Sequence, residues 1–287
     1  YFKKELNIIP LKYLIKKYFI ELKNKHRWGP NSFYYLAGIY GIHPTYIQEM
    51  ISTGFNDSEI LAAIDQLKTS EGSKYNADLI RAEFQKDIKL KPGNWSPVNK
   101  IKKRDTLLIA SGPKSEEYIS AIEDYIKKKK PYVIALNTNV KLEKKLIDIY
   151  AACNPLKFIA DIDSFRKLKR PLVAPKSILD ENIKRKLSKI KIFNFGVGLE
   201  QNTYKFFKNG TIIPKFYTLS YALAIATCGK SKQILLAGFD GYGENDNRTK
   251  LINNLLHQYT TSKGAKKILA ITPTSYTLTF KSLYNIS

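Results

Sequence analysis

The sequence predicts an α/β protein in which a doubly wound, mostly parallel sheet is preceded by a small all-helical domain. From residue 106 onward, short apolar runs alternate with segments of helical period, which is the pattern of parallel strands joined by helices. The earlier part, up to about residue 90, shows only helical spacing. A chain of 287 residues with 44% hydrophobic residues is long and apolar enough to build a core for both parts.

The helical part is divided by breaks and caps. Apolar residues recur at helical spacing over residues 11–22, and Gly29-Pro30 ends that segment. The later segment "NDSEILAAIDQLK" places Ile60 and Ile64 on one face of a further helix. The candidate helix caps are Asn31 or Ser32 and Asn56 or Asp57. The stretch "KLKPGNWSPVNKIKKRD" is rich in Pro, Gly and charge and predicts a linker, so we expect domains at 1–90 and 106–287 joined by residues 91–105.

The second part contains seven candidate strands separated by helical segments. The strands are expected at 106–111, 132–137, 157–162, 171–176, 191–196, 232–238 and 267–272. The helical segments are expected at 115–130, 139–152, 218–231 and 249–264.

Polar residues follow several of these strands directly. In open parallel sheets ligands bind outside the carboxyl ends of the strands, so these residues would meet at one rim. Gly112 would let backbone approach a phosphate, the helix opening at Ser115 offers N–H groups, and Asn137 combines a donor with an acceptor. Each feature alone also fits a turn, a helix cap or an ordinary polar loop. The strand-end residues are Ser111, Gly112, Pro113, Asn137, Thr138, Asn139, Asp161, Asp163, Gly238, Asp240, Gly241 and Tyr242.

Several chemistries have little support in the sequence. The dinucleotide GxGxxG fingerprint and the Walker motif are absent, and "NFGVGLE" offers only two glycines. Cys153 and Cys228 lack CxxC spacing and are expected to be buried thiols, while the histidines lack zinc spacing, so we predict no metal. The net charge of +23 favours anionic partners, but the lysines are spread along helices and can be ordinary solvated residues. Nucleic-acid binding is therefore not expected.

Four motifs in residues 106–280 carry a family resemblance. They are "LLIASGPK", "VIALN", "FYTLSYALAIATCGKSKQILLAGFDGYGEN" and "ILAITPTSY". Together they resemble the bacterial CMP-sialic-acid-dependent sialyltransferases and the related domain of flagellin-modifying glycosyltransferase-like proteins. The resemblance implies CMP or a CMP-sugar as ligand, a glycan acceptor and no cofactor. It implies that the nucleotide is held by Ser111, Gly112, Pro113, Lys114, Asn137, Asn139, Asp161, Thr218, Gly238 and Tyr242.

The chain departs from that pattern at two places. The Asn-Pro that the family carries after its third strand corresponds in this reading to Asp161 and Asp163. The family's general-base histidine has no counterpart in "GYGENDNRTK", and His257 lies within a predicted helix. Base catalysis needs a group that holds a proton near neutral pH. The candidate substitutes are Asp240, Glu244 and Asp246.

The first part, in "RWGPNSFYYLAGIYGIHPTYIQEMI" and "NDSEILAAIDQL", resembles the C-terminal helical region of 4-hydroxy-2-oxovalerate aldolase relatives in the HMG-CoA-lyase-like group. The resemblance implies an aldolase barrel as partner and a role in lipopolysaccharide or capsule biosynthesis. The leading hypothesis is thus a glycosyltransferase-like, nucleotide-sugar-binding domain of a bifunctional, homo-oligomeric cytoplasmic protein without a transmembrane segment. The alternative is a non-catalytic nucleotide-binding or assembly module attached to an aldolase.

Overall fold

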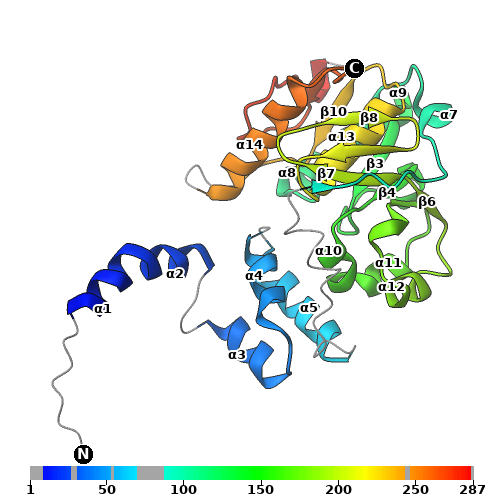
Figure 1. The fold of residues 1–287 in the computed structure, drawn as a ribbon. Coiled ribbons are helices and arrows are strands. Elements are labelled where there is room, and N and C mark those ends of the chain that lie inside the picture. Colours follow the sequence, from blue (N-terminus) through cyan, green and yellow to red (C-terminus); the bar gives the residue numbers. More distant parts are fainter. Residues whose placement is uncertain (1–8, 27–30, 53–54, 70–86, 243–245, 286–287) are drawn as a thin grey trace, which may run out of the picture. The chain divides into compact units, whose positions relative to one another are not determined.

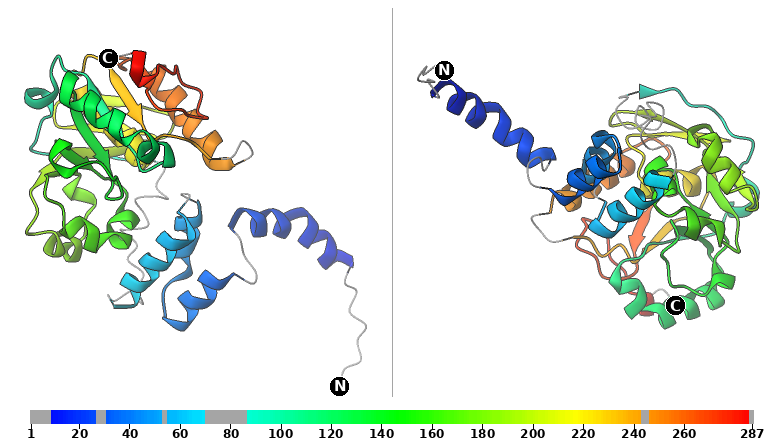
Figure 2. Two further views of the ribbon diagram at one scale, coloured as in Figure 1. Left: turned by 180° about the vertical axis from the view of Figure 1, so that it is seen from behind. Right: turned by 90° about the horizontal axis from the view of Figure 1, so that it is seen from below.

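The computed structural model describes residues 9–26, 31–52, 55–69, 87–242 and 246–285. The chain forms two compact units, residues 1–80 and residues 81–287 (Figure 1). The first is helical, and the second is built on a parallel sheet flanked by helices (Figure 2). This confirms the predicted α/β class with a preceding helical region.

Two helices of the first unit, α3 and α5, begin at predicted caps. The Asn31 side chain accepts a hydrogen bond from the backbone N–H of Phe33 at 2.9 Å. Asn56 and Glu59 form a reciprocal capping box, with each side chain accepting from the other's backbone N–H at 2.9 and 3.0 Å. The helices are α1 (Ile9–Leu14), the π-helix η1 (Ile15–Phe19), α2 (Ile20–His26), α3 (Ser32–Ile39), α4 (Pro44–Ser52) and α5 (Asp57–Thr69).

The main sheet of the second unit has seven strands in the order β11-β10-β2-β3-β4-β5-β6. All neighbouring pairs are parallel. Its strands are β2 (Thr106–Ile109), β3 (Tyr132–Leu136), β4 (Ile149–Ala151), β5 (Leu172–Ala174), β6 (Ile192–Asn194), β10 (Ile234–Ala237) and β11 (Ile268–Ala270). The connecting helices are α8 (Pro113–Glu117), α9 (Ile119–Lys129), η2 (Lys144–Leu146), α10 (Pro155–Ala160), α11 (Ile162–Arg166), η3 (Lys176–Ile178), α12 (Glu181–Lys186), α14 (Asn247–Thr260) and η4 (Leu283–Asn285).

One strand prediction was wrong. Residues 157–162, expected as a strand, lie in α10 and α11, and the strand is instead β4, inside the segment 139–152 that was expected to be helical. The reason is the Asn154-Pro155 dipeptide. The Asn154 side chain accepts from the N–H groups of Leu156 and Lys157 at 2.9 and 3.2 Å, and Pro155 stands in the first helical turn, where its missing N–H costs nothing.

A second sheet of four strands, in the order β1-β7-β9-β8, was not expected from the sequence. Its strands are β1 (Asp87–Ile88), β7 (Gly196–Glu200), β8 (Lys205–Phe207) and β9 (Gly210–Ile213). The glycines of "NFGVGLE" belong to β7 and allow close backbone packing. A Cβ on Gly196 would overlap the backbone of Lys91, and a Cβ on Gly198 would lie 2.7 Å from the carbonyl oxygen of Ile88.

The second unit begins before the predicted linker. Residues 87–105 contain β1 and the short helix α7 (Val98–Ile101), and Ile101 is fully buried. The indole of Trp95 stacks on the ring of Phe193 with centroids 5.0 Å apart. Residues 91–105 therefore pack as part of the α/β unit, whose first described strand starts at residue 87.

The helix α13 (Thr218–Cys228) forms the centre of the second unit. Every one of its residues is buried, and the helix contacts β3 and β4 of the main sheet as well as β8 and β9 of the second sheet. A helix covered on both sides is apolar around its whole circumference, which explains "TLSYALAIATC". In the parts of the chain that are described, no helix combines the length and apolar character that crossing a membrane requires.

Candidate functional site

The candidate site lies at the carboxyl ends of four adjacent strands. Because β10, β2, β3 and β4 are neighbours and parallel, the residues that follow them emerge at the same edge of the sheet. Neighbouring strands lie about 4.8 Å apart, so this edge presents side chains over a span of roughly 15 Å. Asp240, Ser111, Asn137 and Asn154 follow these strands in that order.

The loop after β2 is tied to the loop after β10. The N–H of Gly112 donates to the carbonyl oxygen of Gly238 at 3.0 Å, and the N–H of Lys114 donates to Oδ2 of Asp240 at 2.6 Å. The N–H of Ser115 donates to the carbonyl oxygen of Gly112 at 2.8 Å, and Pro113 has no N–H. The backbone donors of residues 112–115 thus already have acceptors, and a phosphate bound there would have to displace the Asp240 carboxylate.

Glycine is required where these loops meet. Gly238 has a φ of +73°, a left-handed conformation that favours glycine, and its N–H donates to Oγ1 of Thr272 at 2.9 Å. A Cβ on Gly238 would overlap the carbonyl oxygen of Ala110, and a Cβ on Gly112 would overlap the carbonyl oxygen of Gly238. The loops after β2 and β10 are therefore held in backbone contact.

Asp240 combines a fixed carboxylate with a polar atom that has no hydrogen-bond partner. Its Oδ2 is anchored on Lys114, whereas its Oδ1 is buried and accepts no hydrogen bond from the residues that the structure describes. Burial raises the pKa of this carboxyl group, and the hydrogen bond from the Lys114 backbone only partly offsets that effect. A carboxylate with a raised pKa at a strand end is suited to accept a proton.

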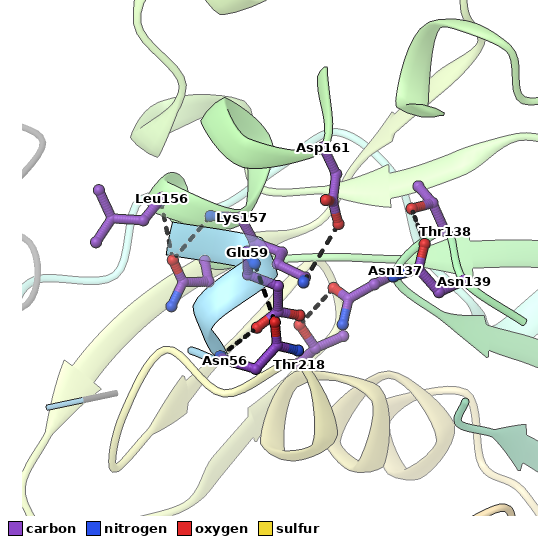
Figure 3. Close-up of polar contacts among 10 residues, drawn as sticks. Asn56, Glu59, Asn137, Thr138, Asn139, Leu156, Lys157, Asp161 and Thr218 are labelled. Atoms are coloured by element: carbon purple, nitrogen blue, oxygen red, sulfur yellow. Dashed lines mark hydrogen bonds and ion pairs between the residues drawn. The ribbon is translucent and has the colours of Figure 1, made fainter. Parts of the chain in front are cut away.

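Asn137 is held in an unusual conformation directly after β3. Its φ is +57°, its N–H donates to the carbonyl oxygen of Ala151 at 3.0 Å, and its side-chain Oδ1 accepts from the Thr218 hydroxyl at 3.1 Å (Figure 3). With the amide oxygen occupied, the two N–H groups of the amide are the side chain's remaining donors. The side chain is half-buried, so these donors can meet a ligand at the edge of the sheet.

The N-terminus of α13 reaches the same edge through Thr218, its first residue. This helix has no side-chain cap at its N-terminus, in contrast to α10, which Asn154 caps. A helix N-terminus carries a partial positive charge and N–H groups directed along its axis, so anions are favoured there. The Asn137 amide and the first turn of α13 thus place hydrogen-bond donors together.

A buried ion pair on α10 was not anticipated from the sequence. The Lys157 ammonium lies 3.3 Å from Oδ2 of Asp161, four residues later, and the two side chains are only 9% and 13% exposed (Figure 3). Asp161 was expected after a strand but ends α10 instead. Its Oδ2 makes this ion pair without accepting a hydrogen bond. The signal for the helix, and hence for Lys157, was "NP" in "AACNP".

Most of the other predicted residues are exposed or occupied. Ser111 and Asn139 are exposed, and the Thr138 hydroxyl donates to Asn139 at 3.2 Å. Asp163 is exposed on α11 and pairs with Arg166 at 3.4 Å, away from the strand end where it was expected. Glu244 lies outside the described residues.

Tyr242 and Asp246 are joined through Arg248. The guanidinium lies 3.9 Å from the centroid of the Tyr242 ring, which is 42% exposed, and pairs with Asp246 at 2.7 Å. Asp246 also caps α14 by accepting from the Arg248 backbone at 2.8 Å. The hydrogen bonds from Arg248 lower the pKa of Asp246, so it is a weaker base than Asp240.

In the part of the chain that the structure describes, the histidine and cysteine side chains supply no alternative chemistry at this edge. His257 is exposed on α14, and the thiols of Cys153 and Cys228 are both buried. Burial raises the pKa of the Cys228 thiol to about 12, which makes it inert as a nucleophile. Among the described residues, no three His, Cys, Asp or Glu side chains are grouped as a metal ion would require.

No family model matches the chain, and no curated protein sequence matches it. Among solved structures, the chain is similar to the MAf glycosyltransferase from Magnetospirillum magneticum AMB-1, with a TM-score of 0.47 and 9% identity. The similarity covers 84% of this chain and 41% of that one, so the chain spans about two fifths of that protein's length. Similarity at this level does not establish a family or an activity.

Proposed function

We propose that the α/β unit binds a cytidine nucleotide-sugar at the carboxyl edge of β10, β2, β3 and β4, and transfers the glycosyl group to a glycan acceptor. The observation that carries this proposal is the hydrogen bond between Thr218 and Asn137, which presents two amide donors beside the uncapped N-terminus of α13. Two strands away stands Asp240, a carboxylate with a raised pKa.

In this proposal the nucleotide occupies the β3–β4 side of the edge. The phosphate takes the Asn137 amide donors and the first turn of α13, where negative charge is favoured. The base lies toward α10, where the Asp161 carboxylate, paired with Lys157 at 3.3 Å, can also accept from an exocyclic amino group. Cytosine has such an amino group and uracil does not, so an acceptor at this place favours cytidine over uridine.

The sugar occupies the β2–β10 side. The backbone donors of residues 112–115 are already used, so we assign this loop to the sugar rather than to the phosphate. The exposed Ser111 hydroxyl and the Asp240 carboxylate face it. Asn137 and Asp240 follow strands separated by β2, about 10 Å apart, which leaves room for a sugar between the proposed phosphate and Asp240.

Asp240 acts as the base in the transfer step. Its carboxylate takes the proton from an acceptor hydroxyl while that oxygen forms a bond to the anomeric carbon. The bond between the anomeric carbon and the phosphate oxygen breaks, and the nucleotide leaves with the electron pair. Asp246 is held ionised by Arg248 and is less suited to accept the proton.

Calorimetry with nucleotides tests the binding half. We expect CMP to bind more tightly than UMP or AMP, and Asn137→Ala to weaken CMP binding by about tenfold, or about 1.4 kcal/mol. Asn139→Ala is the matched control, because this exposed asparagine stands two residues later and should change the affinity by less than about twofold. Failure of the wild-type protein to bind CMP at millimolar concentration would remove the proposal.

A second candidate is a non-catalytic nucleotide-binding or assembly module. It is favoured by the hydrogen bond between Asp240 and Lys114, because a carboxylate that joins two loops can be purely structural. Turnover of a CMP-sugar, measured by release of CMP, distinguishes the two. Loss of that turnover in Asp240→Asn but not in Asp246→Asn supports catalysis, whereas CMP binding without turnover supports the module.

The helical unit is proposed as the connection to an aldolase barrel in a lipopolysaccharide or capsule enzyme, and we propose that the assembly is a homo-oligomer in the cytoplasm. Support comes from the resemblance of "RWGPNSFYYLAGIYGIHPTYIQEMI" and "NDSEILAAIDQL" to aldolase C-terminal regions. The test is mass measurement in solution together with an aldol-cleavage assay on the full-length protein. A monomer, or a full-length protein without aldolase activity, counts against it.

A further inference from the structure

A cleft of about 550 Å³ lies between α11 and α12 of the α/β unit. Its position sets it apart from the candidate site, because Lys167 and Ile190 in its wall come shortly before β5 and β6. The cleft is therefore at the amino ends of these strands, whereas the candidate site is at the carboxyl ends of β10 to β4. Nothing in the proposed glycosyl transfer uses it.

The lining of this cleft is strongly basic. Five positive side chains face one carboxylate, that of Asp163, which pairs with Arg166 at 3.4 Å. Among the described residues, no carboxylate lies within ion-pair distance of Lys186 or Lys189. The positive residues are Arg166, Lys167, Arg185, Lys186 and Lys189.

Such a group of like charges is unfavourable by itself. Positive charges a few ångströms apart repel one another, and they repel more strongly in a cleft than on a flat surface because less water screens them. An anion placed among them removes the repulsion and gains attraction to each. The volume of the cleft is within the range of small-molecule sites, which leaves room for more than a single small ion.

We propose that this cleft binds a small molecule that carries at least two phosphate groups. The two arginines, Arg166 and Arg185, supply planar guanidinium forks that match phosphate oxygens, and the lysines add point charges. Ser188 and Asp163 add hydrogen-bonding partners for hydroxyl groups, which a phosphorylated sugar would offer. The proposal does not depend on the function assigned to the carboxyl edge.

Inorganic pyrophosphate is the probe. Titration calorimetry at constant ionic strength should show that pyrophosphate binds to the full chain at least about tenfold more tightly than sulfate. The reason is that pyrophosphate can contact the basic side chains of the cleft with two phosphate groups, whereas sulfate is a single small anion. Lys167→Gln combined with Lys189→Gln should weaken pyrophosphate binding by about tenfold or more. Both side chains are exposed, so the replacement should not disturb folding.

The matched control is Lys128→Gln combined with Lys129→Gln. These exposed lysines close α9, and the change removes the same charge from the protein outside the cleft. Pyrophosphate affinity should stay within about twofold of wild type in this control. The proposal would be overturned if both double variants lost pyrophosphate affinity equally, or if wild type bound sulfate as tightly as pyrophosphate. It would also be overturned if a short DNA duplex bound more tightly than pyrophosphate and lost affinity equally in both variants. CMP affinity should be unchanged in both variants.

Discussion

The carboxylate of Asp240 accepts a hydrogen bond of 2.6 Å from the backbone N–H of Lys114, at the first turn of α8. The place where an α/β fold commonly holds a phosphate is thus occupied by the protein's own acid. Two strands away, the N-terminus of α13 has no such side chain. This contrast places the proposed phosphate next to Asn137 and leaves Asp240 for the sugar.

Replacing Asp240 by asparagine should have opposite effects on stability and activity. Asparagine can still accept from Lys114, but it removes a carboxyl group whose pKa burial raises. The folded state holds that proton more firmly than the unfolded state, so wild-type stability falls as the pH rises from the ordinary aspartate range through the raised pKa. Asp240→Asn should therefore gain stability relative to wild type over that interval and level off above it.

Urea unfolding of both proteins between about pH 3 and pH 8 measures this difference. Wild-type transferase activity, if Asp240 is the base, should decline as the pH falls through the same raised pKa, because the carboxylate becomes protonated. A stability difference independent of pH would show that Asp240 has no raised pKa.

The Thr218 hydroxyl should matter for nucleotide binding through Asn137. Thr218→Val removes the donor that fixes the amide and should weaken CMP binding by about threefold to tenfold, the range expected for one hydrogen bond. Thr218→Ser keeps the hydroxyl and should bind CMP nearly as well as wild type. Equal affinities of the valine and serine variants would mean that the hydrogen bond does not orient Asn137 for the ligand.

Two buried hydroxyl groups, on α13 and α14, should act as one unit. The Lys266 N–H donates to the Tyr259 hydroxyl at 2.9 Å, and the Thr227 hydroxyl donates to the carbonyl oxygen of Leu223 at 2.8 Å. The 2.6 Å contact between the two hydroxyls is therefore donated by Tyr259. Tyr259→Phe leaves buried polar groups without partners and should lower the free energy of unfolding by about 1–3 kcal/mol.

The double variant Tyr259→Phe with Thr227→Val tests that coupling. It should be less destabilised than the sum of the single changes, because both hydroxyls are removed together. Chemical unfolding of the four proteins gives the interaction energy. Additive effects would indicate that the two hydroxyls contribute independently.

Gly238→Ala should disturb the whole carboxyl edge. The new Cβ would overlap the carbonyl oxygen of Ala110 and would require a left-handed conformation that alanine adopts reluctantly. We expect a loss of more than about 2 kcal/mol in unfolding free energy together with loss of CMP binding. Gly38→Ala in α3 is the contrasting variant, because the new Cβ would meet open space. Alanine also favours the helix more than glycine does, so the free energy of unfolding should rise slightly.

Elements could be predicted from the sequence where local signals and long-range packing agree. The apolar run and following glycine predicted β10 and its loop, and Asn31 and Asn56 predicted the helix starts of the first unit. The sequence was insufficient where a short strand has no period of its own. β4 has three residues, and the charged, leucine-containing stretch before it suggested a helix.

That one misassignment hid part of the site. Once β4 is recognised as the third strand of the main sheet along the chain, the Asn-Pro dipeptide that follows it is Asn154-Pro155. The sequence pattern alone matches that position to Asp161 and Asp163 instead. The buried Lys157 belongs to the helix α10 that follows β4, although a lysine in an apolar stretch gives no indication of its burial. The second sheet escaped prediction because its glycines pack against a backbone segment about a hundred residues earlier, a contact that no local pattern encodes.

The pairing of β1 with β7 also has a consequence during synthesis. Ile88 pairs with Leu199, so the segment that covers the glycines of β7 leaves the ribosome long before its partner exists. Until β7 has been synthesised, β1 has no strand to pair with. The second sheet therefore cannot form during translation of the first half of the α/β unit. Closure of this sheet is expected only after β7 has left the ribosome, and β1 remains an unpaired strand up to that point.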